Sequence, residues 1–288
     1  MITIFTTPRP FEGLFNMVQR NAIESWLNFN EECQIILFND EKDTSRKIAQ
    51  EYNLQCVTNV ACNEYGTPLL HDVFDKVISC SEYDIIAQVN TDIILFDDFL
   101  ESIAEIQQLV KGLFFMVGRR WDLDVDYRIN YSDVNWRKTL LRNVEAGGKL
   151  HGLSGIDYWV FPKQLRFELP AFVVGRPGID SWLIGEARRM QVPVIDTTEK
   201  VTIVHQNHNY PAKKRDHYEI ERKRNIKLAG GFSRMMTLRD ANWRLTDKGV
   251  IKPPPGRRIL SNLSSFYPWR KLLAFKRLLW AFFSSLSF

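Results

Sequence analysis

The chain has 288 residues, of which 45% are hydrophobic and 25% charged. This composition is typical of a soluble globular protein with a large core, and it excludes disorder, collagen and coiled coil. The 38 basic and 34 acidic residues give a net charge of +4, but residues 252–288 hold seven basic and no acidic side chains. Residues 1–251 therefore carry −3, which argues against nucleic-acid binding because such proteins need a basic face.

The four cysteines form no Cys-x-x-Cys pair, and a chain of this length does not need disulfides to fold. They are Cys33, Cys56, Cys62 and Cys80. We therefore expect a reducing, cytoplasmic setting. Met1 leads directly into a strand-like run without the basic and apolar regions of a secretory signal, and no run reaches the roughly 18 apolar residues of a spanning helix.

In chain order, short β-rich runs alternate with helical patterns, which predicts βαβ units around a mostly parallel sheet. The predicted strands cover residues 2–6, 34–38, 55–57, 85–89, 114–118, 158–161 and 201–205, and the predicted helices cover 14–27, 44–52 and 68–80. The third helix is expected to have Thr67 as its N-cap and Pro68 in its first position. The proline-rich spacer at residues 252–256 predicts a domain boundary after residue 251.

Polar residues follow several predicted strands at their carboxyl ends, where open α/β sheets bind ligands. They are Thr6-Thr7, Asn39-Asp40 and Asn90-Thr91-Asp92. No glycine-rich loop follows the first strand, so neither a dinucleotide fingerprint nor a P-loop can hold a phosphate. The carboxylate of Asp92 could instead bind a divalent cation that in turn binds two phosphates.

This pattern resembles the glycosyltransferase-A fold family, whose members transfer a sugar from a nucleoside diphosphate and carry an Asp-x-Asp motif after a central strand. Residues 90–92 match the motif in position, with Asn90 in place of the first aspartate. The resemblance implies a single Rossmann-like α/β domain at residues 1–251 with a mostly parallel mixed sheet, followed by a helical tail at residues 252–288.

The same resemblance implies a donor site at the carboxyl ends of the strands. Thr6, Thr7 and Asp40 would line the base and ribose pocket, with Asp40 accepting a hydrogen bond from a uracil or guanine N–H. Asn90 would hydrogen-bond the ribose. Asp92 would contact Mn²⁺ or Mg²⁺.

Residues 151–162 resemble the family's glycine-containing loop and strand, over which the donor sugar and the acceptor lie. The resemblance implies that Gly155 lies in that loop, that Asp157 hydrogen-bonds sugar hydroxyls and that Trp159 stacks on a pyranose face. Alternation along a strand leaves core packing open as the other interpretation of Trp159.

Residues 175–187 are predicted to form a loop that leads into a helix, with Asp180 as the N-cap or in the first turn. The helix dipole would keep this carboxylate ionised, either for capping alone or for accepting a proton. Asp180 resembles the family's catalytic base, which inverting members need and retaining members do not. Trp182 is expected to contact the sugar or the acceptor.

His205 ends a predicted apolar strand, where the resemblance places a late metal or pyrophosphate ligand that would share the cation with Asp92. His208 is the alternate ligand, and a hydrogen-bonded surface histidine is the other interpretation. Residues 213–224 read as a solvated helix. Alternatively, Lys213, Lys214 and Arg215 could close over the diphosphate as a lid.

The C-terminal residues 269–283 form a basic amphipathic pattern that is too short to span a bilayer. Such a helix suits an anionic membrane surface, although docking on the body or on a partner subunit is the other interpretation. Membrane attachment predicts a protein that is peripheral on the inner, cytoplasmic face of a membrane. It also fits an acceptor that is lipid-linked or is a growing glycan, as in polysaccharide biosynthesis.

The function that these patterns favour is a metal-assisted hexosyltransferase that uses a nucleotide-sugar donor. A sugar-phosphate nucleotidyltransferase is the second enzyme class, but it should open with a glycine-rich loop that Thr6–Pro10 does not form. A non-catalytic protein that binds a nucleotide sugar or a membrane surface is the third hypothesis, and Asn90 is the residue that keeps it open.

Overall fold

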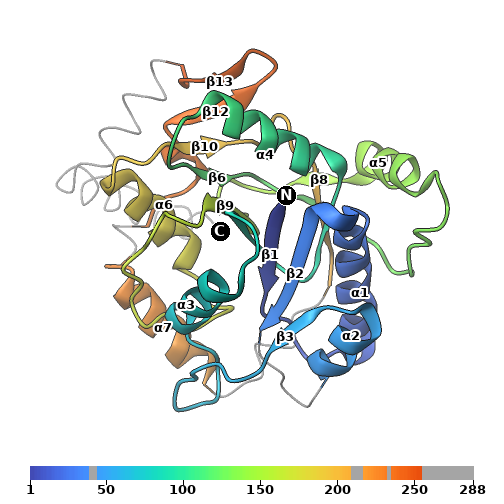
Figure 1. The fold of residues 1–288 in the computed structure, drawn as a ribbon, viewed down its shortest axis with the longest axis horizontal. Coiled ribbons are helices and arrows are strands. Elements are labelled where there is room, and N and C mark those ends of the chain that lie inside the picture. Colours follow the sequence, from blue (N-terminus) through green and yellow to red (C-terminus); the bar gives the residue numbers. More distant parts are fainter. Residues whose placement is uncertain (39–43, 209–216, 232–234, 255–288) are drawn as a thin grey trace, which may run out of the picture.

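The computed structural model describes residues 1–38, 44–208, 217–231 and 235–254 (Figure 1). Its strands are β1 (Ile2–Thr6), β2 (Cys33–Phe38), β3 (Gln55–Val57), β4 (Ile85–Val89), β5 (Ile93–Leu95), β6 (Phe115–Val117), β7 (Trp121–Leu123), β8 (Lys149–Leu150), β9 (Tyr158–Pro162), β10 (Val194–Asp196), β11 (Ile203–Gln206), β12 (Trp243–Thr246) and β13 (Gly249–Ile251). Its helices are α1 (Gly13–Leu27), α2 (Thr44–Tyr52), α3 (Leu70–Cys80), α4 (Asp97–Leu109), α5 (Trp136–Gly147), α6 (Ile179–Arg189) and α7 (Tyr218–Leu228).

The larger sheet has nine strands in the order β13-β12-β10-β6-β9-β4-β1-β2-β3. Five of its neighbouring pairs are parallel, and β9 lies antiparallel between β4 and β6. The pair β12 and β13 is also antiparallel. The predicted fold class, an α/β domain with a mostly parallel mixed sheet, is confirmed.

Helices cover both faces of this sheet (Figure 1). Ile2 and Ile4 of β1 belong to the core that packs against α1, α2 and α4, whereas Phe5 belongs to the core that packs against α3 and α6. Successive side chains of a strand point to opposite faces, so a strand covered on both faces is apolar throughout. This layering leaves the carboxyl ends of β1 and β4 open for a ligand.

A smaller sheet, in the order β5-β11-β7-β8, lies beside the larger one and has its own apolar cluster with α5. The strand predicted at residues 201–205 corresponds to β11, so placing it in the main sheet was wrong. It pairs antiparallel with β5 and parallel with β7. In that register His205 lies opposite both Ile93 and Asp122, which brings polar residues of three segments together.

The start of α3 also differs from the prediction. The helix begins at Leu70 with Leu69 as its N-cap, two residues later than Pro68. Pro68 and Leu69 are extended, and the Pro68 carbonyl accepts a hydrogen bond from the Val174 N–H at 2.9 Å. Pairing with the segment around Val174 therefore replaces the first helical turn.

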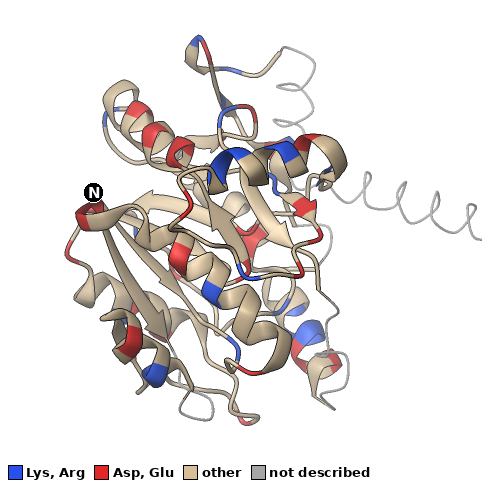
Figure 2. Ribbon diagram, turned by 90° about the vertical axis from the view of Figure 1, so that its right-hand side faces the viewer, with Lys and Arg blue, Asp and Glu red and all other residues tan. Residues whose placement is uncertain are grey.

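Helices α4 and α5 carry mostly opposite charges and are joined by an ion pair. Figure 2 shows acidic residues along α4 and basic residues along α5, and Arg137 of α5 pairs with Asp97 of α4 at 3.0 Å.

Among the described residues, none of the helices combines the length and the apolar character needed to cross a membrane. The sheet ends with β13 at Ile251, and the amphipathic segment 269–283 lies outside the described residues.

Candidate active site

A cavity of about 480 Å³ opens at the carboxyl ends of β1 and β4. Eight of the residues predicted from the sequence line it: Thr6, Thr7, Asn90, Asp92, Gly155, Asp157, Trp159 and Asp180. They come from four separate stretches of the chain. Asp40 and the residues Lys213, Lys214 and Arg215 lie outside the described residues.

At the Asp92 side of this cavity, Asp92, His205 and His208 form a cluster whose possible ligand atoms all lie within 4.8 Å of one another. Asp92 Oδ2 lies 3.0 Å from His208 Nε2 and 3.5 Å from His205 Nε2. The two histidine side chains are almost fully buried. The pairing of β5 with β11 explains this proximity, because it places His205 opposite Ile93, the residue after Asp92.

The unused polar atoms of this cluster suit a divalent cation. Among the described residues, Asp92 Oδ1 is buried without a hydrogen-bond partner, and the ring nitrogens of His205 make long contacts of 3.5 Å to Asp92 and 3.3 Å to Asp122. Buried polar atoms are rarely left unpaired in proteins. A carboxylate oxygen and imidazole nitrogens together suit a cation such as Mn²⁺, so the residues present fit the implied metal.

The electrostatics of the cluster favour the charged carboxylate. Burial opposes ionisation of Asp92, but hydrogen bonds and opposite charge from His205 and His208 outweigh it and hold the pKa of Asp92 far below its usual range. For His205, burial lowers the pKa, and the contact with Asp92 more than compensates, so the net pKa is raised.

Asp157 uses both carboxylate oxygens within the protein. Oδ1 accepts a hydrogen bond from the Asn90 side-chain amide at 2.6 Å, and Oδ2 pairs with Arg120 at 2.7 Å. Each oxygen of Asp157 thus has one protein partner and can accept a further hydrogen bond, so its contact with sugar hydroxyls stays a prediction. The contact also explains Asn90: an amide can donate to Asp157, whereas a second carboxylate would repel it.

Arg120 and Asp122 are site residues that the sequence analysis missed. Arg120 lines the cavity, and its Nε donates to Asp122 Oδ1 at 2.8 Å. Asp122 also lies 3.3 Å from His205 Nδ1 and 2.6 Å from His151 Nδ1. Arg120 lies three residues after the end of the apolar strand β6, a position that could have identified it. Asp122 lies in β7, whose three residues are too few to show a period.

Asp180 lies in the first turn of α6, as predicted, with Gly178 as the N-cap. Its Oδ1 accepts a hydrogen bond from Trp159 Nε1 at 2.7 Å. Burial raises the pKa of Asp180 to about 6, and the Trp159 hydrogen bond only partly offsets that effect. A carboxyl group with this pKa is still mostly ionised at neutral pH, as expected for the first turn of a helix. A base with this pKa can accept a proton near neutral pH.

The two tryptophans take different places. Trp159 lines the cavity, is 4% exposed and packs against Phe74 with ring centroids 5.9 Å apart, so it belongs both to the core and to the site. Trp182 does not line the cavity. It lies in the core against Phe172, with ring centroids 5.5 Å apart, and so the structure does not bring it to the predicted sugar-binding position.

Thr6, at the end of β1, is buried and shares a 2.8 Å hydrogen bond with the Thr91 hydroxyl. This bond joins the ends of β1 and β4 at the floor of the cavity. Thr7 follows at the half-buried edge. The two threonines therefore line the cavity, and their contact with a base and a ribose stays a prediction.

Helix α7 is not the fully solvated helix that the charge pattern suggested. Glu221 turns inward and forms an almost fully buried ion pair with Arg176, which lines the cavity, at 2.6 Å. The Asn225 side chain bonds the backbone N–H and the carbonyl of Val173, both at 2.9 Å. These contacts hold the loop around Val173 and Arg176, which leads to Asp180, against α7. The sequence pattern of a polar helix does not show that Glu221 and Asn225 point into the protein rather than into solvent.

No protein-family model and no curated protein matches the chain. Among solved structures, it is similar to glucosyl-3-phosphoglycerate synthase from Mycobacterium tuberculosis in complex with Mg²⁺ and uridine diphosphate, with a TM-score of 0.48 and 14% identity over 80% of each chain. It is also similar to Staphylococcus aureus TarS residues 1–349 in complex with UDP-GlcNAc, with a TM-score of 0.35 and 12% identity over 56% of this chain and 45% of that one. Because this likeness is distant, the function depends on what the chain's own residues can do.

Proposed function

We propose that this protein is a glycosyltransferase that moves a hexosyl group from a nucleoside diphosphate to an acceptor hydroxyl. One observation carries the proposal. A single cavity is lined both by Asp92, a member of a cluster suited to a divalent cation, and by Asp180, a half-buried carboxylate whose pKa is raised to about 6. Sugar transfer from a diphosphate needs both: charge compensation for the leaving group and a base for the acceptor.

Each end of the cavity has its own task in this proposal. Asp92, His205 and His208 would hold Mn²⁺ or Mg²⁺, which when bound supplies positive charge to the diphosphate. Thr6 and Thr7 would contact the nucleoside. Arg120 supplies a fixed positive charge at the same wall, because Asp122 and Asp157 hold its guanidinium in place.

At the other end, Asp180 would accept the proton of the attacking hydroxyl. Trp159 donates to Oδ1, which fixes the carboxylate and leaves Oδ2 to face the acceptor. A base that acts directly on the acceptor supports a single displacement at the anomeric carbon. The product would then have the inverted configuration, which NMR of the anomeric proton can test.

The test of this function is binding and turnover of nucleotide sugars. Purified protein is screened by thermal shift against UDP-, GDP- and dTDP-sugars, with and without Mn²⁺, since a ligand at 100 times its dissociation constant stabilises a protein by about 2.7 kcal/mol. We expect a metal-dependent shift with one nucleotide and release of that nucleotide upon turnover. Folded protein that responds to none of the donors in the presence of Mn²⁺ would refute the proposal.

We further propose that the acceptor is a glycan or a lipid-linked saccharide and that residues 269–283 bring the enzyme to the inner face of a membrane. The alternation of Arg270, Lys271, Lys276 and Arg277 with apolar residues supports this. Co-sedimentation of the full chain with anionic vesicles should be lost when these four residues are changed to Glu. Equal sedimentation of both proteins would contradict the membrane role.

A further inference from the structure

Helix α1 supports the strand that follows Asp92. Trp26 Nε1 donates to the Ile93 carbonyl at 3.0 Å, and the Leu95 N–H donates to the Ser25 hydroxyl at 3.1 Å. Both contacts are buried. Since β5 is the edge strand of the smaller sheet, one side of its backbone would otherwise lack partners. Side chains of α1 supply them.

The same helix holds β11 through a buried pair of amides, Asn21 and Gln206, neither of which has exposed surface. The Asn21 amide donates to Gln206 Oε1 at 2.9 Å. Gln206 Nε2 donates to the Val18 carbonyl at 2.8 Å and to the Asp92 carbonyl at 3.3 Å. The Gln206 backbone N–H donates to that same Asp92 carbonyl at 3.2 Å. Gln206 therefore joins α1, β11 and the backbone of Asp92.

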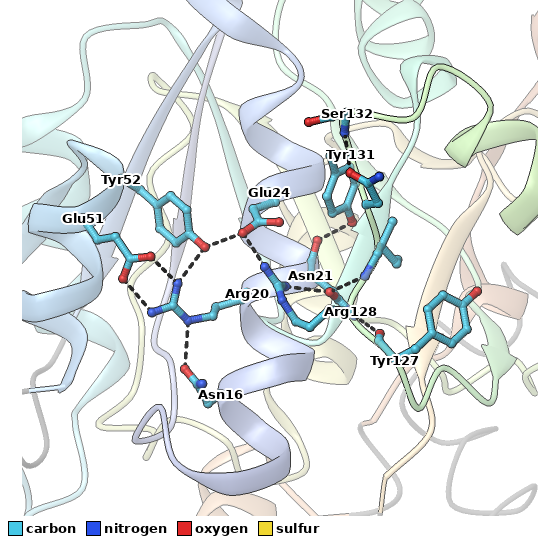
Figure 3. A network of polar contacts seen from close by, with 12 residues as sticks. Asn16, Arg20, Asn21, Glu24, Glu51, Tyr52, Tyr127, Arg128, Tyr131 and Ser132 are labelled. Atoms are coloured by element: carbon cyan, nitrogen blue, oxygen red, sulfur yellow. Dashed lines mark hydrogen bonds and ion pairs between the residues drawn. The ribbon is translucent and has the colours of Figure 1, made fainter.

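Asn21 also makes hydrogen bonds to the segment 127–129, as Figure 3 shows in part. Its Oδ1 accepts hydrogen bonds from Arg128 at 2.7 Å and from the Ile129 N–H at 3.1 Å, and its amide also donates to the Tyr127 carbonyl. Arg128 in turn pairs with Glu24 of α1 at 2.5 Å. Both donors and the acceptor of Asn21 are thus used. A buried amide with all its hydrogen bonds made is rigid, and it can hold its partner in one orientation.

From these contacts we propose that Gln206, oriented by Asn21, is a positioning residue for the metal cluster. It would fix the backbone of Asp92 against β11, so that Asp92 and His205 hold their mutual geometry before a cation binds. Helix α1 also contacts the cluster directly, because the ring centroid of Phe15 lies 5.0 Å from that of His208. The inference rests on the proposed function, because it concerns the cation which that function needs.

The test is Mn²⁺ affinity, measured from the electron paramagnetic resonance signal of free Mn²⁺ without any donor or acceptor. Gln206→Met keeps the side-chain length and removes the three side-chain hydrogen bonds. Loss of a residue that orients metal ligands typically weakens metal affinity about 10–100-fold, and we expect a loss in that range. Wild-type affinity in Gln206→Met would overturn the positioning role while leaving the proposed function intact.

The control is Asn242→Ala, which removes a side-chain hydrogen bond to the Val194 N–H between β10 and the β12 side of the larger sheet. It should bind Mn²⁺ like the wild type, and an equal loss there would overturn the proposal by showing a general effect of destabilisation. If Gln206→Met does not fold, Asn21→Asp replaces it, because it keeps the acceptor for Arg128 but loses the donor to Gln206. Unchanged affinity in Asn21→Asp would also overturn the proposal. Wild-type protein that binds no Mn²⁺ would overturn the proposed function and this inference together.

Discussion

The two sheets differ in what their strands contribute. The strands of the larger sheet around β1 and β4 are buried on both faces, and their side chains build the two cores. The smaller sheet has strands of two to four residues and carries Asp122 and His205 among its apolar side chains. Asp92, Arg120 and His151 line the cavity and directly flank strands of the smaller sheet. The larger sheet therefore provides a rigid floor, whereas β11 and the segments that flank the smaller sheet provide the groups that can bind a metal. Substitutions should therefore be able to remove proton acceptance by Asp180 without removing cation binding by Asp92, and the reverse.

The largest expected effect concerns the base, which belongs to a helix packed on the larger sheet. Asp180→Asn should lower kcat about 10²–10⁴-fold, because the acceptor hydroxyl loses its proton acceptor. The Mn²⁺ affinity should not change, since Asp92 and the two histidines remain. Steady-state kinetics and a Mn²⁺ titration measure the two quantities. A kcat within threefold of the wild type would mean that Asp180 is not the base.

The second effect concerns the smaller sheet. Asp92→Asn removes the negative charge of the cluster and should weaken Mn²⁺ binding by at least about 10²-fold, with loss of metal-dependent donor binding. Asp84→Asn is the matched control, since Asp84 is an exposed aspartate just before β4, at the opposite end of that strand from the site. Calorimetric titration with Mn²⁺ measures both affinities. Equal affinities in the two variants would contradict the proposed role of Asp92 as a metal ligand.

A third variant tests the junction between the sheets. Asn90→Asp restores the family's aspartate but places a carboxylate 2.6 Å from the position of Asp157 Oδ1. Loss of a hydrogen bond to a charged group, together with like-charge repulsion, should lower the free energy of unfolding by about 1–3 kcal/mol. Urea denaturation measures this difference. A more stable Asn90→Asp protein would show that the amide is not selected by Asp157.

The last effect, which is confined to a narrow pH range, is the pH dependence of stability. Burial raises the pKa of Asp180 from 3.8 to about 6 in the folded protein, so the folded state binds its proton more tightly than the unfolded state. This contribution to stability is fully present below pH 4 and is lost as the pH rises through 6. Relative to the wild type, Asp180→Asn should therefore gain stability between pH 4 and pH 7, by about 3 kcal/mol at most. Melting temperatures of both proteins across this range measure the gain, and a constant difference would contradict the raised pKa.

The sequence predicts six of the nine strands of the larger sheet, misses β10, β12 and β13, and predicts only β11 of the smaller sheet. β1 and β4 have the predicted bounds, because buried parallel strands are apolar runs bounded by turn residues. β3 also has the predicted bounds, although it is a partly exposed edge strand. β5, β7 and β8 have two or three residues, too few for a period, and their pairing depends on distant segments.

The same distinction applies to the site. Asp92, His205 and His208 follow or end recognisable strands, so sequence reasoning could name them, and the structure brings them together. The partners of Asp157 and the inward turn of Glu221 depend on three-dimensional packing. The position of Arg120 shortly after β6 could have marked it as a site residue. Its ion pairs with Asp122 and Asp157 could not have been predicted, because Asp157 is distant in the sequence and the orientation of the side chains depends on the fold.

The most direct measurement is a crystal structure grown with Mn²⁺ and the nucleotide that the binding screen selects, with anomalous data collected at the manganese edge. The account predicts one strong anomalous peak within bonding distance of Asp92 and at least one of His205 and His208, with the diphosphate on its open side and the sugar directed toward Asp180. An anomalous peak elsewhere, or a nucleotide bound outside this cavity, would contradict the central claim that the two sheets meet at a metal-assisted sugar-transfer site.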